Sequence, residues 1–251
     1  MSGGQAEKLS IVIPVYNEER TLEALLKRVA EAPLAIDREI IAVNDGSGDG
    51  SGAILENWRK KHGGEAFRVL HRPNGGKGAA VRDGIAVSTG SIVIIQDADL
   101  EYDPADYGKC VAPILSGECA VVYGSRERKK HNRSSYWRFY LGGLAVTWWM
   151  NLLFRGGLTD EPTCYKTFRG DLIRLLPFEN DDFGWEPEVT AKLLRLGWEI
   201  REVPISYCPR HLEEGKKIRC KDGLKAFRIA LEWRFRSLKS LRALRRVQTK
   251  A

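Results

Sequence analysis

Two aspartates and a glutamate, spaced two residues apart, follow an apolar run near the middle of the chain. Residues 92–96 read IVIIQ, and Asp97, Asp99 and Glu101 come after them. Carboxylate oxygens of this kind suit Mg²⁺ or Mn²⁺, which keep only one or two protein carboxylates when they share a substrate phosphate. Solvated loop acids are the alternative. The sequence favours a divalent metal site that also holds a phosphorylated substrate.

A glycine-rich turn is the second feature that suits phosphate. Residues 74–78 read NGGKG and open a predicted helix, so free backbone N–H groups, the helix dipole and Lys77 would meet an anion there. The turn is not a Walker loop. It is not the GxGxxG fingerprint either, because position 81 is Val81. A plain turn fits these residues equally well.

These polar residues need elements to position them, and the first half of the chain alternates short β-branched runs with helical patterns. The continuous apolar strands predict an α/β fold with a doubly wound, mostly parallel sheet covered on both faces. Strands are predicted at 9–16, 39–45, 67–72, 91–99 and 120–125, and helices at 21–32, 52–63, 77–88 and 103–117.

Polar side chains collect where each predicted strand ends. They lie at 14–18, 44–47, 72–78, 96–99 and 124–126. In an open parallel sheet, ligands bind beyond the carboxyl ends of the strands. We therefore expect one ligand site, built from five consecutive strand ends.

The second half of the chain is less regular. We expect a polar loop at 126–135, an aromatic helix at 136–154, a strand at 163–169, a helix at 185–197, a strand at 199–207 and a long basic helix at 222–246. These elements predict a flexible tail at 1–8, one domain over 9–210, and a basic loop with an amphipathic C-terminal helix over 211–251.

At these strand ends the sequence resembles the family 2 glycosyltransferases, which are inverting nucleotide-sugar enzymes of the GT-A fold. The matching strings are IVIPVYNEE, VNDGSGDGS, NGGKGAAVRDG, QDADLEYDP and GSR, over residues 9–126. Later strings, TDEPTCYKTF, FGWEPEVTAKLLRLGWEIREVPISY and EEGKKI, resemble the branch that includes dolichyl-phosphate mannose synthase and dolichyl-phosphate glucosyltransferase.

The resemblance implies a role for each matching residue. The nucleotide base and ribose would contact Asp45 and the turn that contains Pro14, Tyr16, Asn17 and Glu18. The metal would be bound by Asp97 and Asp99, with Glu101 at the position of a third ligand. The donor diphosphate or a lipid phosphate would contact Arg126, Arg138, Arg210 and Lys216. Asp160 is the candidate general base if the acceptor is a hydroxyl.

The reaction implied is the inverting transfer of a single hexose from a nucleotide sugar to a polyprenyl (dolichyl-type) phosphate, with Mg²⁺ or Mn²⁺ as cofactor. GDP-mannose is favoured over UDP-glucose as the donor. A phosphate acceptor is already largely dianionic at neutral pH, so it needs cations to hold it and no general base. A family 2 enzyme that acts on a sugar hydroxyl or another non-lipid acceptor is the alternative.

Charge is unevenly distributed along the 251 residues. The whole chain carries a net charge of +7, and residues 201–251 hold 15 basic and 5 acidic side chains. A basic protein of this kind can bind nucleic acid. Because the basic excess lies in one C-terminal segment, we favour a membrane surface over nucleic acid.

Two predicted helices carry that membrane hypothesis. Residues 136–154 are rich in aromatic rings and too short and interrupted to span a bilayer, and residues 222–246 form a basic amphipathic pattern. A helix buried against the core and a membrane partner subunit are the alternatives. The five cysteines include no CxxC pair, which favours reduced thiols and a cytoplasmic protein peripheral to the membrane.

Overall fold

The computed structural model describes residues 7–64, 66–129, 132, 137–210, 220–241 and 244. The first half alternates strands and helices as predicted. Its elements are β1 (Lys8–Val15), α1 (Leu22–Glu31), β2 (Asp37–Asp45), α2 (Ser51–His62), β3 (Phe67–Arg72), α3 (Lys77–Val87), β4 (Ile92–Ile95), the 3₁₀ turn η1 (Pro104–Asp106), α4 (Tyr107–Leu115) and β5 (Val121–Ser125).

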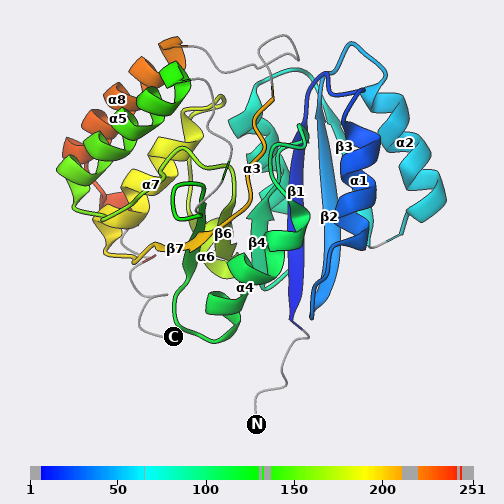
Figure 1. The fold of residues 1–251 in the computed structure, drawn as a ribbon, viewed down its shortest axis with the longest axis horizontal. Helices are drawn as coiled ribbons and strands as arrows, with labels where there is room; N and C mark the ends of the chain where they lie inside the picture. The colour runs from blue at the N-terminus through cyan, green and yellow to red at the C-terminus, as the bar shows by residue number, and fades with distance from the viewer. Residues whose placement is uncertain are drawn as a thin grey trace.

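The second half completes the same sheet. It contributes α5 (Trp137–Phe154), β6 (Lys166–Arg169), α6 (Gly170–Leu175), α7 (Trp185–Leu196), β7 (Arg201–Pro204), α8 (Cys220–Phe235) and the 3₁₀ turn η3 (Lys239–Leu241). The described strands form a sheet in the order β3-β2-β1-β4-β6-β5-β7, parallel except for β6 (Figure 1). The predicted α/β fold with a mostly parallel sheet is confirmed.

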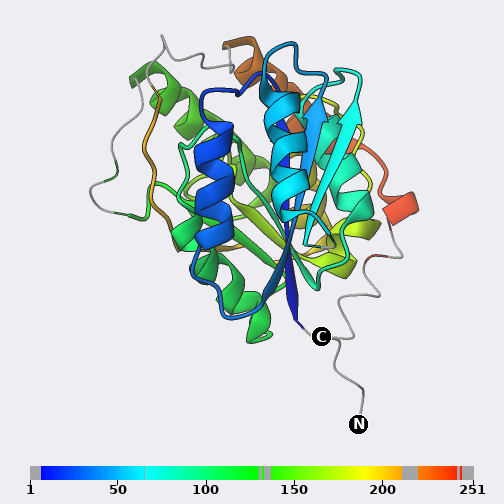
Figure 2. The ribbon, with the colours of Figure 1, turned by 90° about the vertical axis from the view of Figure 1, so that its right-hand side faces the viewer.

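Strand β2 shows why its sequence is apolar without alternation. Ile40 and Ala42 face the large core cluster, whereas Ile41 and Val43 face a second cluster with Ala80 of α3. Successive side chains of a strand point to opposite faces, so all four are buried only because both faces are covered. Figure 2 shows α1 and α2 side by side, at the end of the molecule opposite α5 and α8 in Figure 1.

Helix α3 lies unusually close to the sheet. A Cβ added at Gly84 would come within 2.4 Å of Val12 Cγ1 and 3.3 Å of Val43 Cγ2. Only a glycine permits this approach, which sets the distance between the later part of α3 and the sheet. The sequence string NGGKGAAVRDG thus serves packing as well as the site.

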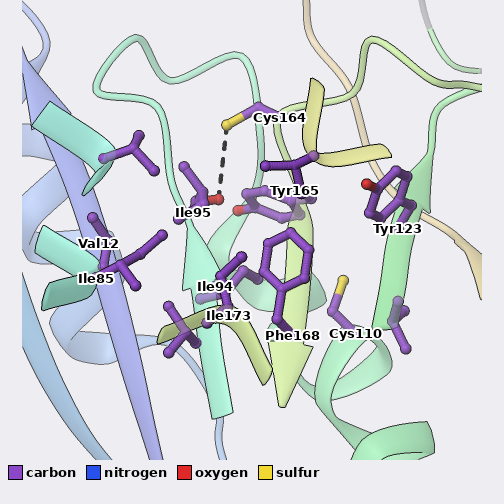
Figure 3. Close-up of a cluster of buried hydrophobic side chains, with 14 of the residues drawn as sticks. Val12, Ile85, Ile94, Ile95, Cys110, Tyr123, Cys164, Tyr165, Phe168 and Ile173 are labelled. Atoms are coloured by element: carbon purple, nitrogen blue, oxygen red, sulfur yellow. Dashed lines mark hydrogen bonds between the residues drawn. The ribbon is translucent and has the colours of Figure 1, made fainter. Parts of the chain in front are cut away.

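The antiparallel strand β6 links the two halves of the sheet. It pairs with β4 on one side and with β5 on the other. Figure 3 shows Phe168 of β6, and Tyr165 directly before that strand, beside Ile94 and Ile95 of β4. The Cys164 thiol donates a hydrogen bond to the carbonyl oxygen of Ile95 at 3.7 Å. This packing brings the segment before β6 to the edge where β4 ends.

Helices α5, α7 and α8 form a layer at one end of the sheet (Figure 1). Trp149 of α5 packs its ring on Phe227 of α8 and donates its indole N–H to the Phe227 carbonyl oxygen at 3.1 Å. Arg195 of α7 donates to the carbonyl oxygens of Trp233 and Arg236. The three helices are therefore held together by specific contacts.

The prediction of one helix over 222–246 is wrong at its C-terminal end, because α8 ends at Phe235. Within α8, Ile229, Ala230 and Trp233 are buried, whereas the apolar residues Leu224, Leu231 and Phe235 are exposed. Packing on α5 and α7 selected a face that apolar spacing alone did not distinguish. No helix among the described residues is long and apolar enough to cross a bilayer.

Candidate functional site

The polar ends of β1, β2, β4 and β5 meet at the upper edge of the sheet in Figure 1. Two hydrogen bonds join the turn after β1 to the turn after β2. The Asn17 side chain accepts from the Gly48 N–H at 2.8 Å, and the Glu18 N–H donates to Ser51 Oγ at 2.8 Å. Asn17 adopts a left-handed backbone conformation, with φ of 49°. These contacts hold Asn17 and Glu18 beside the end of β2, directly after Pro14 at the end of β1 and the exposed Tyr16.

Asp97 and Asp99 each contact a cation from a distant segment. Lys77 Nζ, at the start of α3, lies 2.9 Å from Asp97 and 2.9 Å from Glu186 at the start of α7. Arg210 donates to Asp99 Oδ2 at 3.2 Å and to Glu18 at 2.9 Å. The structure therefore brings the two predicted metal-binding aspartates and two of the predicted phosphate-binding cations together.

The pKa of Asp99 is shifted by its neighbours in this cluster. Burial and the negative charges of Asp97 and Glu101 raise the pKa of Asp99 to about 7, against the opposing charge of Arg210. Crowded carboxylates of this kind are stabilised by a bound cation. Asp97 and Asp99 are thus a chemically suitable pair for a hard divalent ion that completes its coordination with substrate phosphates.

Glu101 has a different environment from the one predicted. Its carboxylate accepts from the Tyr207 hydroxyl at 2.8 Å and from the Arg210 backbone N–H at 3.0 Å. Within the described part of the chain, no three acidic, histidine or cysteine side chains are grouped so that they could hold a metal ion. Glu101 instead ties the segment that carries Arg210 to the turn after β4.

The predicted phosphate cradle at the start of α3 is closed by protein groups. The N–H groups of Gly75 and Gly76 donate to Asp45, and the Ala79 N–H donates to the carbonyl oxygen of Asp181. The prediction that the amides of the 74–78 turn are free for an anion is therefore wrong for Gly75 and Gly76. Lys77, the basic residue of this turn, contacts Asp97.

Asp45, predicted to contact the nucleotide, is 3% exposed. It forms an ion pair with Arg72, at the end of β3, in addition to its two backbone contacts. The sequence predicted no role for Arg72. Asp45 therefore fixes the turn between β3 and α3 in this structure.

Arg126 and Asp160 form a buried bidentate pair. Arg126 Nε and Nη2 donate to the two Asp160 oxygens at 2.8 Å and 2.6 Å, and the guanidinium stacks over the Tyr207 ring at 5.0 Å. Burial raises the pKa of Asp160, but the Arg126 charge and hydrogen bonds lower it further, so the net pKa is below its usual range. An acid with both oxygens occupied and a low pKa is a poor general base, which argues against that role.

Of the remaining predicted cations, one lies apart from this cluster and the other is not described by the structure. Arg138 is exposed in the first turn of α5, where its guanidinium stacks on the Trp137 ring at 5.3 Å. Lys216 lies outside the described residues. Sequence reasoning missed Glu186, which is 7% exposed. Acids are common in the first turn of any helix, so Glu186 carried no distinguishing pattern.

Comparison with known proteins is consistent with this geometry. A family model described as "Glycosyl transferase family 2" matches residues 10–174. Undecaprenyl-phosphate 4-deoxy-4-formamido-L-arabinose transferase of Aeromonas hydrophila is 36% identical over 131 residues, which are 51% of this chain and 40% of that protein. The Pseudomonas fluorescens enzyme of the same name is 37% identical over 140 residues, or 55% of this chain and 41% of that protein. The matches therefore span about two fifths of these relatives.

Solved structures establish the fold. Glucosyl-3-phosphoglycerate synthase of Mycobacterium tuberculosis, in complex with phosphoglyceric acid, superposes with a TM-score of 0.69 at 22% identity, over 90% of this chain and 80% of that one. The same enzyme with Mn²⁺, UDP and glucosyl-3-phosphoglycerate gives a TM-score of 0.67 at 21% identity, over 91% and 80%. The likeness is that of the GT-A fold.

Proposed function

Because the chain belongs to glycosyl transferase family 2 and is a glycosyltransferase of the GT-A fold, we propose that it transfers one hexose from a nucleotide sugar to a polyprenyl phosphate at the cytoplasmic surface of a membrane. The observation that carries the proposal is the pair Asp97 and Asp99, flanked by Lys77 and Arg210 at the carboxyl edge of the sheet. Cations and metal-binding carboxylates at this edge are what two phosphorylated substrates require.

The acceptor is inferred from the relatives and from the ion pairs of the site carboxylates. The relatives named above are transferases that act on undecaprenyl phosphate. Four carboxylates of the site are paired with cations: Asp97 and Glu186 with Lys77, Asp99 with Arg210, and Asp160 with Arg126. A hydroxyl acceptor needs a base, whereas a phosphate dianion does not. The pairing therefore supports a phosphate acceptor.

The reaction is a single displacement. An acceptor phosphate oxygen forms a bond to the anomeric carbon, and the bond from that carbon to the donor phosphate breaks. The electron pair leaves with the nucleoside diphosphate, and the configuration at the carbon inverts. Mg²⁺ or Mn²⁺, bound by Asp97 and Asp99, would supply positive charge for the leaving diphosphate. Lys77 and Arg210 border the same carboxylates and orient phosphate oxygens there.

Surface residues on α5 support the membrane location. Trp137, Leu141, Trp148 and Leu152 are between 52% and 65% exposed, and their spacing places them on one helical stripe. Exposed tryptophans beside leucines are typical of helices that lie in a membrane interface. We call these four residues the α5 stripe. A membrane partner subunit is the alternative occupant of this stripe.

A transfer assay with matched acceptors tests the proposal. The purified chain is incubated with polyprenyl phosphate or the corresponding polyprenol, with GDP-mannose or UDP-glucose, and with Mg²⁺ or Mn²⁺. On the resemblance described above we expect GDP-mannose to be the better donor, with product formed only on the phosphate. Transfer to polyprenol or to a glycan hydroxyl would overturn the phosphate acceptor. Absence of product from every pair would overturn the proposed substrate classes.

A further inference from the structure

A cavity lies where the C-terminal ends of α5, α7 and α8 meet. Its volume is about 700 Å³. The walls combine apolar side chains with guanidinium groups, from Leu152, Leu153, Phe154, Arg155, Leu194, Arg195, Arg234 and Leu238. The catalytic edge is at the opposite end of α5, an 18-residue helix that is about 27 Å long. The transfer reaction described above does not use this cavity.

The charge of the cavity is entirely positive. Arg155, Arg195 and Arg234 contribute to its wall, and no lining residue is acidic. The side chains of Arg155 and Arg234 make no hydrogen bond or ion pair with any other described residue. Burial, together with the Arg234 charge, lowers the pKa of Arg195. Arg195 already donates to the carbonyl oxygens of Trp233 and Arg236, which leaves Arg155 and Arg234 for a ligand. Arginines that line one cavity without a carboxylate are complementary to an anion.

The apolar part of the cavity continues the α5 stripe. Leu152 belongs to both, since it is 57% exposed on the helix and also lines the cavity. Figure 1 shows α5 and α8 side by side, both ending at the lower left, where the cavity lies. The cavity therefore combines apolar side chains that continue the stripe with basic residues. That combination fits a molecule with a phosphate attached to acyl chains.

We propose that this cavity binds the phosphodiester headgroup of an anionic phospholipid, with the lipid chains against the α5 stripe. The inference deepens the membrane association proposed above and rests on it. A bound headgroup would anchor the end of the α5–α8 layer that is distant from the catalytic edge. The protein would then contact the membrane at two depths: aromatic rings in the interface and arginines at the phosphates.

Vesicle sedimentation with a matched charge control tests the site. Binding of the full chain is compared between phosphatidylcholine vesicles with and without phosphatidylglycerol. In Arg155→Gln/Arg234→Gln we expect affinity for the anionic vesicles to fall about 30-fold, the effect of two basic residues at an anionic surface. The control Lys60→Gln/Lys61→Gln removes the same charge from exposed positions on α2, at the other end of the molecule, and should change affinity less than about threefold. An equal loss in both variants would show only general attraction and overturn the site.

Short-chain lipid distinguishes a lipid headgroup from a simple anion. Dihexanoyl phosphatidylglycerol, used below its micelle concentration, should raise the thermal midpoint of the wild-type chain and leave that of Arg155→Gln/Arg234→Gln unchanged. An equal rise with glycerol phosphate, which has no acyl chains, would overturn the lipid assignment. Transfer in detergent with a soluble short-chain acceptor should be the same in both proteins. The transfer assay tests the proposed function, whereas vesicle binding and the thermal shift test the lipid site, so the two failures are distinguished.

Discussion

Charge neutralisation within the protein is the dominant feature of the site residues. Lys77 and Arg210 reach Asp97 and Asp99 from segments that are far apart in the sequence, and Arg126 encloses Asp160. A buried charge that loses its partner is strongly destabilising, whereas a partner that is replaced by another cation is not. The site is thus stable before substrates bind, and its cations are available to phosphates.

Replacing Asp99 separates catalysis from stability. For Asp99→Asn we expect kcat to fall by at least about 100-fold, because a charge that stabilises the leaving diphosphate through its metal ion is lost. The thermal midpoint should stay within a few degrees of the wild-type value, since the substitution also relieves the repulsion from Asp97 and Glu101. Transfer kinetics, Mn²⁺ binding by electron paramagnetic resonance and thermal melts make the comparison.

The control for Asp99→Asn is the same change at Asp171. Asp171 is exposed and forms an ion pair with Arg169, at the other end of β6 from the site. The Asp171→Asn variant should lose neither activity nor Mn²⁺ binding. Activity near the wild-type level in Asp99→Asn would contradict the metal assignment.

Asp160 should matter for folding more than for proton transfer. Asp160→Asn leaves the Arg126 guanidinium buried with a neutral partner, and we expect the free energy of unfolding to fall by about 3 kcal/mol. Urea unfolding measures the loss. In Arg126→Met/Asp160→Asn the loss should be smaller than the sum of the two single losses, because the charges are removed together. A loss below about 1 kcal/mol for Asp160→Asn would contradict this role.

The sequence predicted the site incompletely, for a physical reason. Asp97 and Asp99 were found because they sit where an apolar strand ends, which is a local pattern. Glu186 and Arg72 were missed because their importance arises from partners on other elements, Lys77 and Asp45. The Gly75 and Gly76 amides of the 74–78 turn were wrongly expected to be free, since nothing local shows that Asp45 accepts from them.

At the scale of elements, the distance between α3 and the sheet is set by one glycine. Gly84→Ala should lower the free energy of unfolding by about 1–3 kcal/mol, because the new methyl group overlaps Val12 of β1. Gly108→Ala is the matched control, since a Cβ at that position in α4 meets nothing within 4 Å. It should raise the free energy of unfolding by about 0.5–1 kcal/mol. Urea unfolding of both variants measures these effects, and equal signs would contradict them.

Strand β2 is fastened at its start by Glu39. Burial raises the pKa of Glu39, but hydrogen bonds from Ser10 and Thr89 and the Arg68 charge lower it more, to about 2. Because the folded pKa lies below the unfolded value, ionised Glu39 stabilises the fold at pH above about 4.5, and this contribution disappears as the pH falls towards 2. The fold therefore loses stability in acid through a residue that lies at the opposite end of β2 from the candidate site.

The pH dependence of Glu39→Gln makes that contribution measurable. We expect the variant to lose about 2 kcal/mol of unfolding free energy at pH 7. The difference from the wild type should shrink between pH 4.5 and pH 2, because in this range the carboxyl group of the unfolded chain is protonated while that of the folded chain is still ionised. Glu31→Gln, at an exposed position at the end of α1, is the control and should show no such change. A difference that stays constant with pH would contradict the role of the charge.

The elements themselves were largely predictable, with one informative exception. Strands β1 to β5 and their helices follow from local apolar runs, because a strand covered on both faces leaves a continuous pattern. Helix α8 begins at Cys220, close to the predicted residue 222, but ends at Phe235 and not at residue 246. Leu224, Leu231 and Phe235 are as apolar as the residues that are buried, so only the shape of α5 and α7 selects between the two faces.

On the scale of the whole molecule, the α5 stripe is a different surface from the catalytic edge, so its residues can be changed without altering the site. We expect Leu141→Ser and Trp148→Ser each to weaken binding to phosphatidylcholine vesicles by about tenfold, because each removes a large apolar side chain from the interface. The matched control is Leu175→Ser on α6, a leucine that is 58% exposed outside the stripe. It should leave vesicle binding unchanged. Equal losses in all three variants would contradict a specific membrane face.

The order in which the strands join the sheet also affects how the chain is made. Strand β4 is buried along its length, with β1 on one side and β6 on the other, yet β6 begins at Lys166, long after β4 ends at Ile95. During synthesis the edge of β4 is therefore an unpaired apolar strand while the next segments emerge from the ribosome. Fragments that end between Ser125 and Lys166 should precipitate on expression, and those that extend past Arg169 should remain in solution.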